Sequence, residues 1–198
     1  PFLGGFNRPK IQWIDWDTDG DIDLFILDAS GYLRYMENQG TASAPDFHLI
    51  TTSYQDIFCG GWFYFADYDF DDGDLELIAQ NGEDPDHISY FQNSGGQLVF
   101  SDVLTTVGGE YVTSSSVMTP TFADIDNDGD LDFFTGNSIS GTLNYYENTS
   151  LTNDLPQFEF ITNHWQNIYI VSGTRIEDRH GAAAITFIDL NGNGVLDL

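Results

Sequence analysis

Residues 122–133 read F-A-D-I-D-N-D-G-D-L-D-F, and this stretch decides the fold of the 198-residue chain. Five aspartates stand at every second position from Asp124 to Asp132, around Gly129. Two carboxylates about 4 Å apart repel by roughly 1 kcal/mol in water and by about 4 kcal/mol at an effective dielectric constant of 20. A loop that crowds five of them is unfavourable without a cation. We therefore interpret the stretch as a metal site and not as a solvated acidic surface.

The acidic stretch recurs three times in the chain. Residues 15–24 read D-W-D-T-D-G-D-I-D-L, and residues 189–198 are a copy with fewer charges, D-L-N-G-N-G-V-L-D-L. Residues 67–77 read D-Y-D-F-D-D-G-D-L-E-L, with one extra residue before the glycine. Eighteen of the 32 acidic residues fall into the four segments. The acidic charge is thus a property of a repeated loop.

The donor set of these loops favours calcium. Oxygen ligands select a hard cation over zinc or copper, and donors at positions 1, 3, 5 and 9 with a backbone carbonyl near 7 suit the flexible shell of Ca²⁺ better than the octahedron of Mg²⁺. Glycine at position 6 allows a sharp turn, and this role falls to Gly20, Gly73, Gly129 and Gly194. An EF-hand is excluded because its twelfth position, a bidentate Glu, is here Ile26 or Thr135, and because the flanks resemble strands.

A longer repeat surrounds the loops. An aromatic-apolar-Glu/Gln-Asn pattern ends at Asn38, Asn93 and Asn148, at spacings of 55 and 55, and a Phe-rich run follows each copy. We expect four short strands in each unit, the first entering the acidic loop (11–14, 62–66, 119–123, 184–188) and the second leaving it (22–27, 75–79, 131–135). The third strand carries the Asn pattern and the fourth is the Phe-rich run.

Four strands per unit predict an all-β fold, a β-propeller of four-stranded antiparallel blades of about 55 residues. The expected repeat units are about 5–57, 58–113, 114–175 and 176–198, that is, three complete blades and the start of a fourth. Because a propeller closes with 4 to 8 blades, we expect residues 1–198 to be a partial propeller, a fragment of a larger one. A longer parent chain or an assembly partner would supply the remaining blades.

The unit resembles the FG-GAP/VCBS repeat, the blade of integrin-α-like propellers, most closely over residues 122–133 and nearly as well over residues 10–28. The resemblance implies three to four Ca²⁺ ions. In the first and third loops it implies side-chain ligands and the carbonyl of position 7, namely Asp15, Asp17, Asp19, Asp23 and the Asp21 carbonyl, and Asp124, Asp126, Asp128, Asp132 and the Asp130 carbonyl. In the fourth loop the corresponding residues are Asp189, Asn191, Asn193, Val195 and Asp197. In the second loop, which departs by its insertion, Asp67, Asp69, Asp71 and Glu76 are the expected ligands, Asp72 could replace one of them, and Asp74 completes the candidate set.

Composition excludes several classes of function. A formal charge of −27, from 32 acidic and 5 basic residues, argues against nucleic acid as a partner and against docking on an anionic membrane. No apolar run approaches the roughly 20 residues of a membrane span, so we expect no direct insertion. The single Cys59 excludes an internal disulfide framework. The chain carries no nucleophile or nucleotide-binding fingerprint, and we predict that it is not an enzyme.

The sequence therefore predicts a secreted or cell-surface calcium-binding module for adhesion or recognition. By family resemblance, an unidentified protein or glycan would bind the face opposite the calcium loops. Two alternatives stay open, a part of a calcium-dependent polysaccharide-degrading enzyme and a purely structural spacer. The long connection over residues 163–183 is a possible contact patch, through Trp165, Arg175, Arg179 and His180, although its arginines can equally pair with Glu177 and Asp178.

Overall fold

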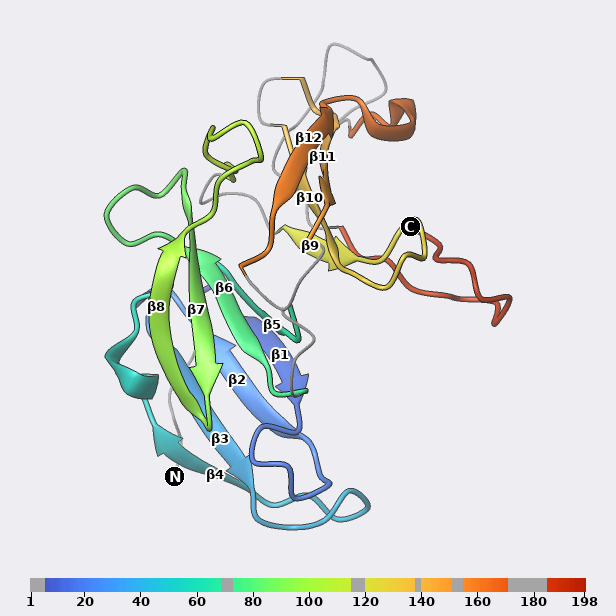
Figure 1. Ribbon diagram of the computed structural model, residues 1–198. Coiled ribbons are helices and arrows are strands. Elements are labelled where there is room, and N and C mark those ends of the chain that lie inside the picture. Colours follow the sequence, from blue (N-terminus) through green and yellow to red (C-terminus); the bar gives the residue numbers. More distant parts are fainter. Residues whose placement is uncertain (1–5, 69–72, 115–119, 138–139, 151–154, 171–184) are drawn as a thin grey trace. The chain divides into compact units, whose positions relative to one another are not determined.

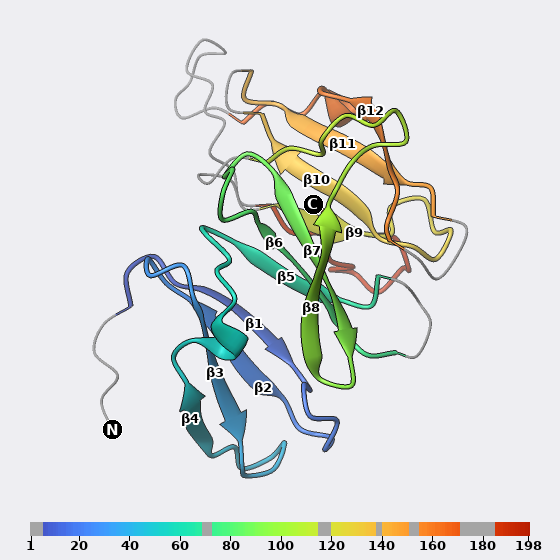
Figure 2. The same cartoon turned by 60° about the vertical axis from the view of Figure 1, so that its left-hand side comes forward.

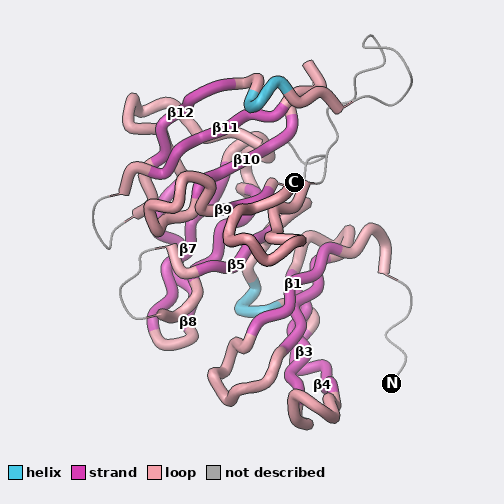
Figure 3. The backbone as a smooth tube through the Cα atoms, turned by 90° about the vertical axis from the view of Figure 1, so that its right-hand side faces the viewer, coloured by secondary structure: helices cyan, strands magenta, loops and turns pink. Residues whose placement is uncertain are grey.

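The computed structural model describes residues 6–68, 73–114, 120–137, 140–150, 155–170 and 185–198. Within these residues the chain forms twelve strands in three four-stranded antiparallel sheets (Figure 1). In the described residues, helix is limited to two 3₁₀ turns, η1 (Tyr54–Asp56) and η2 (Trp165–Asn167), drawn in cyan in Figure 3. The prediction of an all-β fold with propeller-like blades is confirmed.

Each sheet is a simple meander in which neighbours along the chain are neighbours in the sheet (Figure 2). The first sheet contains β1 (Lys10–Ile14), β2 (Asp23–Leu27), β3 (Leu33–Asn38) and β4 (Phe47–Thr51). The second contains β5 (Phe63–Ala66), β6 (Glu76–Gln80), β7 (Ile88–Ser94) and β8 (Gln97–Val103). The third contains β9 (Thr121–Ala123), β10 (Asp132–Gly136), β11 (Leu143–Asn148) and β12 (Phe158–Thr162).

The acidic stretches fall where the sequence places them, between the first and second strands of a sheet. The second strands begin one residue later than predicted, at Asp23, Glu76 and Asp132, because the residue before each of them still belongs to the loop. In the fourth repeat a single antiparallel bridge joins Ile188 to Asp197 across the loop. No helix among the described residues is long and apolar enough to cross a membrane.

The chain divides into two compact units. One comprises Pro1–Asp67, Asp72–Pro85 and Ser89–Asp102, and the other Tyr68–Asp71, Asp86–Ile88 and Val103–Leu198. In the first unit, one face of the first sheet packs against the second sheet through buried side chains, including Phe25, Leu27, Leu33, Tyr35, Phe63, Phe65, Leu77 and Ala79. The Gln12 side chain crosses this junction, where Nε2 donates to the Phe65 carbonyl at 2.6 Å and Oε1 accepts the Phe65 N–H at 2.8 Å.

One contact between successive repeats involves the acidic loops themselves. The residue at loop position 2 packs on the first strand of the next repeat: Trp16 lies 5.0 Å from Phe65, and Tyr68 lies 5.2 Å from Phe122, between ring centroids. At the third loop, Ile125 and Phe187 pack against the same buried cluster. The three phenylalanines all stand two residues before the first Asp of their own loop. The first loop is therefore joined to the second repeat within the first unit, and the third loop to the fourth repeat within the second unit, where Tyr68 also lies.

Candidate metal centres

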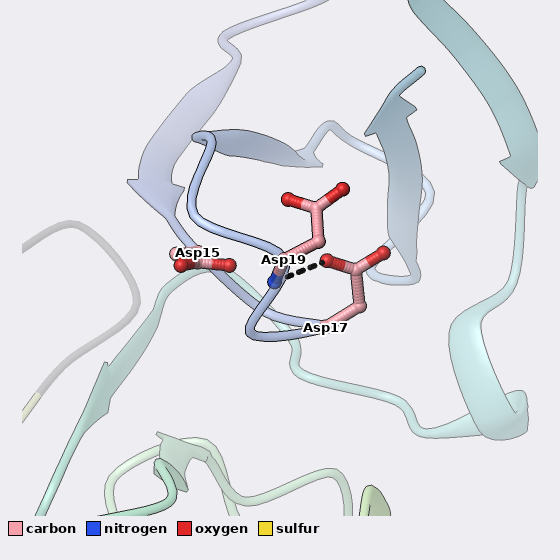
Figure 4. A group of neighbouring side chains, drawn as sticks. All are labelled: Asp15, Asp17 and Asp19. Carbon is pink, nitrogen blue, oxygen red and sulfur yellow. Dashed lines mark hydrogen bonds between the residues drawn. The ribbon is translucent and has the colours of Figure 1, made fainter. Parts of the chain in front are cut away.

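The first acidic loop gathers three carboxylates. Carboxylate oxygens of Asp15, Asp17 and Asp19 lie within 4.8 Å of one another, on the loop that leaves β1 (Figure 4). Backbone donors hold them in place: Gly20 N–H donates to Asp15 Oδ2 at 3.1 Å, and Asp19 N–H donates to Asp17 Oδ1 at 3.3 Å. The alternation of the sequence thus brings positions 1, 3 and 5 to one point.

The third loop repeats this arrangement. Carboxylate oxygens of Asp124, Asp126 and Asp128 again lie within 4.8 Å of one another. Gly129 N–H donates to Asp124 Oδ2 at 3.2 Å, and Asp128 N–H donates to Asp126 Oδ1 at 3.2 Å. The first and third loops begin 109 residues apart, at Asp15 and Asp124. They nevertheless share the same arrangement of carboxylates and backbone donors.

Backbone conformation explains the glycine at position 6. Gly20 has φ of 96° and Gly129 has φ of 105°, in the left-handed region that L side chains rarely adopt. A Cβ at either glycine would meet no atom within 4 Å, so the requirement comes from the backbone and not from space. Position 4 is also left-handed, at Thr18 and Asn127, with φ of 60° and 64°.

The aspartate at position 9 is buried at the start of the second strand. Asp23 and Asp132 are each only 1% exposed. Asp23 Oδ1 accepts the Asn38 N–H at 2.8 Å, and Oδ2 accepts the Trp16 N–H at 3.2 Å. Asp132 makes the matching bonds, to the N–H groups of Asn148 at 2.8 Å and of Ile125 at 3.3 Å. These two carboxylates anchor the loop to the sheet.

Several carboxylate oxygens in the two loops are buried without a hydrogen-bond partner. They are Oδ1 of Asp15, Oδ1 of Asp21 and Oδ1 of Asp130. Asp21 is only 8% exposed, so its oxygen has also lost access to water. A buried carboxylate oxygen without a donor is costly. A cation bound by the triads would relieve that cost directly at Asp15 and would offset the negative charge of Asp21 and Asp130 beside it, so the residues present fit a metal ion with oxygen ligands.

The crowding of charge appears in the acidity of the loops. Burial, reinforced by the neighbouring carboxylates of Asp128 and three other aspartates, raises the pKa of Asp130 to about 7. Burial raises the pKa of Asp132 to about 6. In the first loop, burial and then nearby aspartates raise the pKa values of Asp17 and Asp21. A positive charge is therefore favoured in both loops.

These shifts predict how the stability of the metal-free protein depends on pH. An Asp whose pKa is about 7 when folded and about 3.9 when unfolded binds more protons in the folded state between these values. The free energy of unfolding should therefore fall as the pH rises from 4 to 7. We expect the melting temperature in chelator to be higher at pH 5 than at pH 7.5. Asp130→Asn should flatten this dependence relative to the wild type; an equally steep profile in that variant would contradict the prediction.

The second loop is described only in part. Asp69, Asp71 and Asp72 lie outside the described residues, so the register of this loop stays a prediction. Asp67 and Asp74 are partly exposed on either side of that gap. Glu76, at the position of Asp23 and Asp132, is completely buried in β6.

The fourth loop differs from the triads. Asp189 accepts backbone N–H groups at residues 191, 192, 193 and 194, at 2.7 to 3.3 Å. These bonds lower its pKa. The Asn191 amide donates to Asp197 Oδ2 at 3.2 Å, Asn193 is exposed, and Val195 is 64% exposed. The loop thus has the fold of the others with two carboxylates in place of five, and its use as an ion site stays a prediction.

Among the residues proposed to contact a partner, Trp165 is the one described. Its ring lies 5.0 Å from Phe134 and 5.6 Å from Phe187, between centroids, inside the packing between repeats. Tyr54 occupies the same place after β4, with its ring 5.2 Å from Phe25. This packing explains the position of Trp165, and its contact with a partner stays a prediction. Arg175, Arg179 and His180 lie outside the described residues.

In the sequence, the Tyr-x-x-Asn pattern marks the third strand of each repeat. In the structure it also supports the acidic loops: Asn38 and Asn148 supply the N–H groups that bind the position 9 aspartates. The side-chain carbonyl of Asn38 accepts the N–H groups of Gly40 at 3.1 Å and Asp46 at 2.8 Å, which orders the next loop. The constant 55-residue spacing, parallel to that of the acidic loops, was the available signal.

Comparison with known proteins agrees with this geometry. The model of the FG-GAP-like repeat matches residues 71–135 and again residues 124–198. The search of curated proteins and the search of solved structures each give no match. The two matched segments together span more than half of the chain and include the third and fourth acidic loops. The protein belongs to the family of FG-GAP-like repeat proteins.

Proposed function

We propose that this chain is a calcium-stabilised, propeller-type module of an exported protein, and that it recognises a protein or glycan partner without catalysing a reaction. The observation that carries the proposal is the pair of aspartate triads, each within 4.8 Å, beside buried carboxylate oxygens that have no hydrogen-bond partner. Their donor sets consist of oxygen alone, which favours Ca²⁺ or Mg²⁺.

Calcium suits the loops better than magnesium. Mg²⁺ demands a near-ideal octahedron and keeps several waters, whereas Ca²⁺ accepts six to eight oxygens in a flexible shell. In the first loop Asp15, Asp17, Asp19 and Asp23 would hold the ion together with the Asp21 carbonyl. In the third loop Asp124, Asp126, Asp128 and Asp132 would do so with the Asp130 carbonyl. The ion would neutralise the crowded carboxylates and would supply a partner for the buried Oδ1 of Asp15.

The proposed extracellular location follows from the calcium concentration that the sites would need. Binding at a site with a dissociation constant of about 10 µM stabilises the folded state by about 2.7 kcal/mol at 1 mM calcium. Extracellular calcium reaches that concentration, and the calcium of a resting cytosol is far lower. An exported or cell-surface protein would therefore keep its loops loaded at all times, and calcium would act as a structural component.

The proposed recognition surface is the end of each sheet opposite its acidic loop. In the first unit, Tyr32 precedes β3 and Phe58 precedes β5, so both lie in connections at that end. They are 37% and 43% exposed, and their rings meet edge to face at 5.3 Å. In the second unit, His87 and Tyr111 stack at 3.9 Å, and Tyr111 is 53% exposed. Exposed aromatic rings of this kind suit contact with a sugar or with an apolar protein surface.

Two features support a role without catalysis. Cys59 is completely buried, and burial raises the pKa of its thiol, so it stays protonated and inert. The chain holds only 5 basic residues, too few to line a cleft for acidic polysaccharides. Turnover of pectin-type polymers by the purified chain would contradict this part of the proposal.

A calcium titration tests the metal sites directly. By calorimetry we expect at least two sites with dissociation constants on the order of 10 µM, which magnesium displaces poorly. Asp126→Asn should weaken one site at least about tenfold, since it removes one ligand charge. Glu110→Gln removes the same charge from an exposed side chain outside the loops and should leave both sites unchanged. Absence of calcium binding, or equal effects of the two variants, would refute the assignment.

The recognition role is tested by measuring binding of the calcium-loaded protein to panels of glycans and of surface proteins. Saturable binding that weakens in Tyr32→Ala or Tyr111→Ala would support it. Glu110→Gln again serves as the matched surface control. No saturable binding on either panel would favour the structural-spacer alternative.

A further inference from the structure

Two tyrosine hydroxyls reach the position 9 aspartates of the metal loops. Tyr35 Oη donates to Asp23 Oδ2 at 2.9 Å, and Tyr145 Oη donates to Asp132 Oδ2 at 3.3 Å. Both rings are buried, at 6% and 8% exposure, and both stand on the third strand of their sheet. Burial and then the adjacent aspartate raise the pKa of each phenol, which keeps the hydroxyl protonated as a donor.

Each tyrosine is itself fixed by the core. The Tyr35 ring stacks on Phe25 at 4.8 Å, and the Tyr145 ring stacks on Phe134 at 4.8 Å. Phe25 belongs to the cluster between the first and second sheets, and Phe134 belongs to the cluster that receives the fourth repeat. The hydroxyl that meets the aspartate is thus held by the same side chains that pack one repeat on the next.

The carboxylate that accepts the tyrosine hydroxyl also binds the backbone of the acidic loop. Oδ2 of Asp23, which accepts the Tyr35 hydroxyl, also accepts the N–H of Trp16, the loop residue that packs on Phe65. Oδ2 of Asp132 likewise accepts the N–H of Ile125, which packs in the cluster with Phe187. In the fourth repeat Asp197 Oδ2 accepts the equivalent N–H, from Leu190, at 3.1 Å. The position 9 carboxylate is therefore the common point of the tyrosine, the loop and the junction between repeats.

We propose that Tyr35 and Tyr145 are positioning residues that orient the position 9 carboxylates of the two metal loops and so couple ion binding to the packing of one repeat on the next. The proposal rests on the proposed calcium sites. Partners that orient a metal ligand typically change metal affinity 10- to 100-fold when they are removed. The tyrosines act through Asp23 and Asp132 and are not themselves ligands.

The test removes one oxygen atom from each ring. Tyr35→Phe combined with Tyr145→Phe should raise the calcium dissociation constants of both sites by about tenfold or more. Tyr146→Phe is the matched control, because Tyr146 is buried at 5% exposure on the same strand as Tyr145 and its hydroxyl makes no hydrogen bond within the described part of the chain. It should leave calcium affinity unchanged. Should the double variant not fold, each single variant retains one unaltered loop and should weaken one site only.

A second readout separates positioning from a merely structural role. A hydroxyl that only stabilises the fold would lower the melting temperature equally in calcium and in chelator. The proposal requires the calcium-dependent increment to shrink in the tyrosine variants and to persist in Tyr146→Phe. Wild-type affinity and a wild-type increment in the double variant would overturn it. If the wild-type chain itself bound no calcium, the proposed function would fail first, which is a distinguishable outcome.

Discussion

Removing calcium is expected to lower the melting temperature of this chain by about 10 to 20 °C. Two sites with dissociation constants of about 10 µM contribute about 5 kcal/mol together at 1 mM calcium. For a chain of this size, each kcal/mol shifts the melting temperature by about 2 to 4 °C. The physical cause is the repulsion within the two triads, whose carboxylate oxygens lie within 4.8 Å of one another. Differential scanning calorimetry in 1 mM calcium and after chelation measures the shift.

The control for this experiment compares calcium with magnesium. Restoring calcium should restore the melting temperature, and an equal concentration of magnesium should do so poorly. Asp17→Asn combined with Asp126→Asn should shrink the difference between the two conditions, because each change removes one carboxylate from a triad. A melting temperature unchanged by chelation would mean that the loops hold their geometry without an ion. The calcium assignment and the extracellular location would then both be withdrawn.

Truncating the aromatic core of the third sheet should have a comparable effect by a different route. Phe134 is completely buried, stacks on Tyr145 at 4.8 Å and lies 4.7 Å from Phe187. Phe134→Ala should lower the free energy of unfolding by about 3 to 5 kcal/mol, from lost burial and from the cavity left behind. Urea denaturation monitored by fluorescence measures the change.

Phe160→Ala is the matched control for this truncation. Phe160 lies on β12 in the same sheet but is 47% exposed, so the same deletion should cost less than about 1.5 kcal/mol. The loss in Phe134→Ala should persist in chelator, because it originates in packing and not in ligation. Equal losses for the two variants would show that the buried cluster of the third sheet does not hold its fold together.

The sequence predicts the strands and the loops well because both depend on local rules. Alternating aspartates around Gly129 define a turn, and a constant spacing of Asn38, Asn93 and Asn148 defines a unit. The positive φ of the loop glycines and the two triads follow from these patterns. Such features need no knowledge of what lies across the sheet.

Contacts between repeats could not be predicted in the same way. The pairing of Trp16 with Phe65 joins positions 49 residues apart by their numbers, and nothing in either local pattern names the partner. Trp165 illustrates the same difficulty, since an aromatic residue in a long connection is typical of a contact patch as well as of a core. The hydrogen bond from the Tyr35 hydroxyl to Asp23 could not be predicted either, because burial of the aromatic ring is enough to explain a tyrosine at that position.

An aromatic residue at loop position 2 contacts a phenylalanine in the first strand of the next repeat at two places in the chain, so the same type of contact recurs. The same kind of side chain meets the same kind of position at Trp16 with Phe65 and at Tyr68 with Phe122. In arrays stabilised by nearest neighbours, an added unit needs only to match the unit beside it. Duplication of a gene segment encoding one repeat would therefore yield a chain whose new joint is already complementary. Such a lineage can change its number of repeats without inventing a new interface.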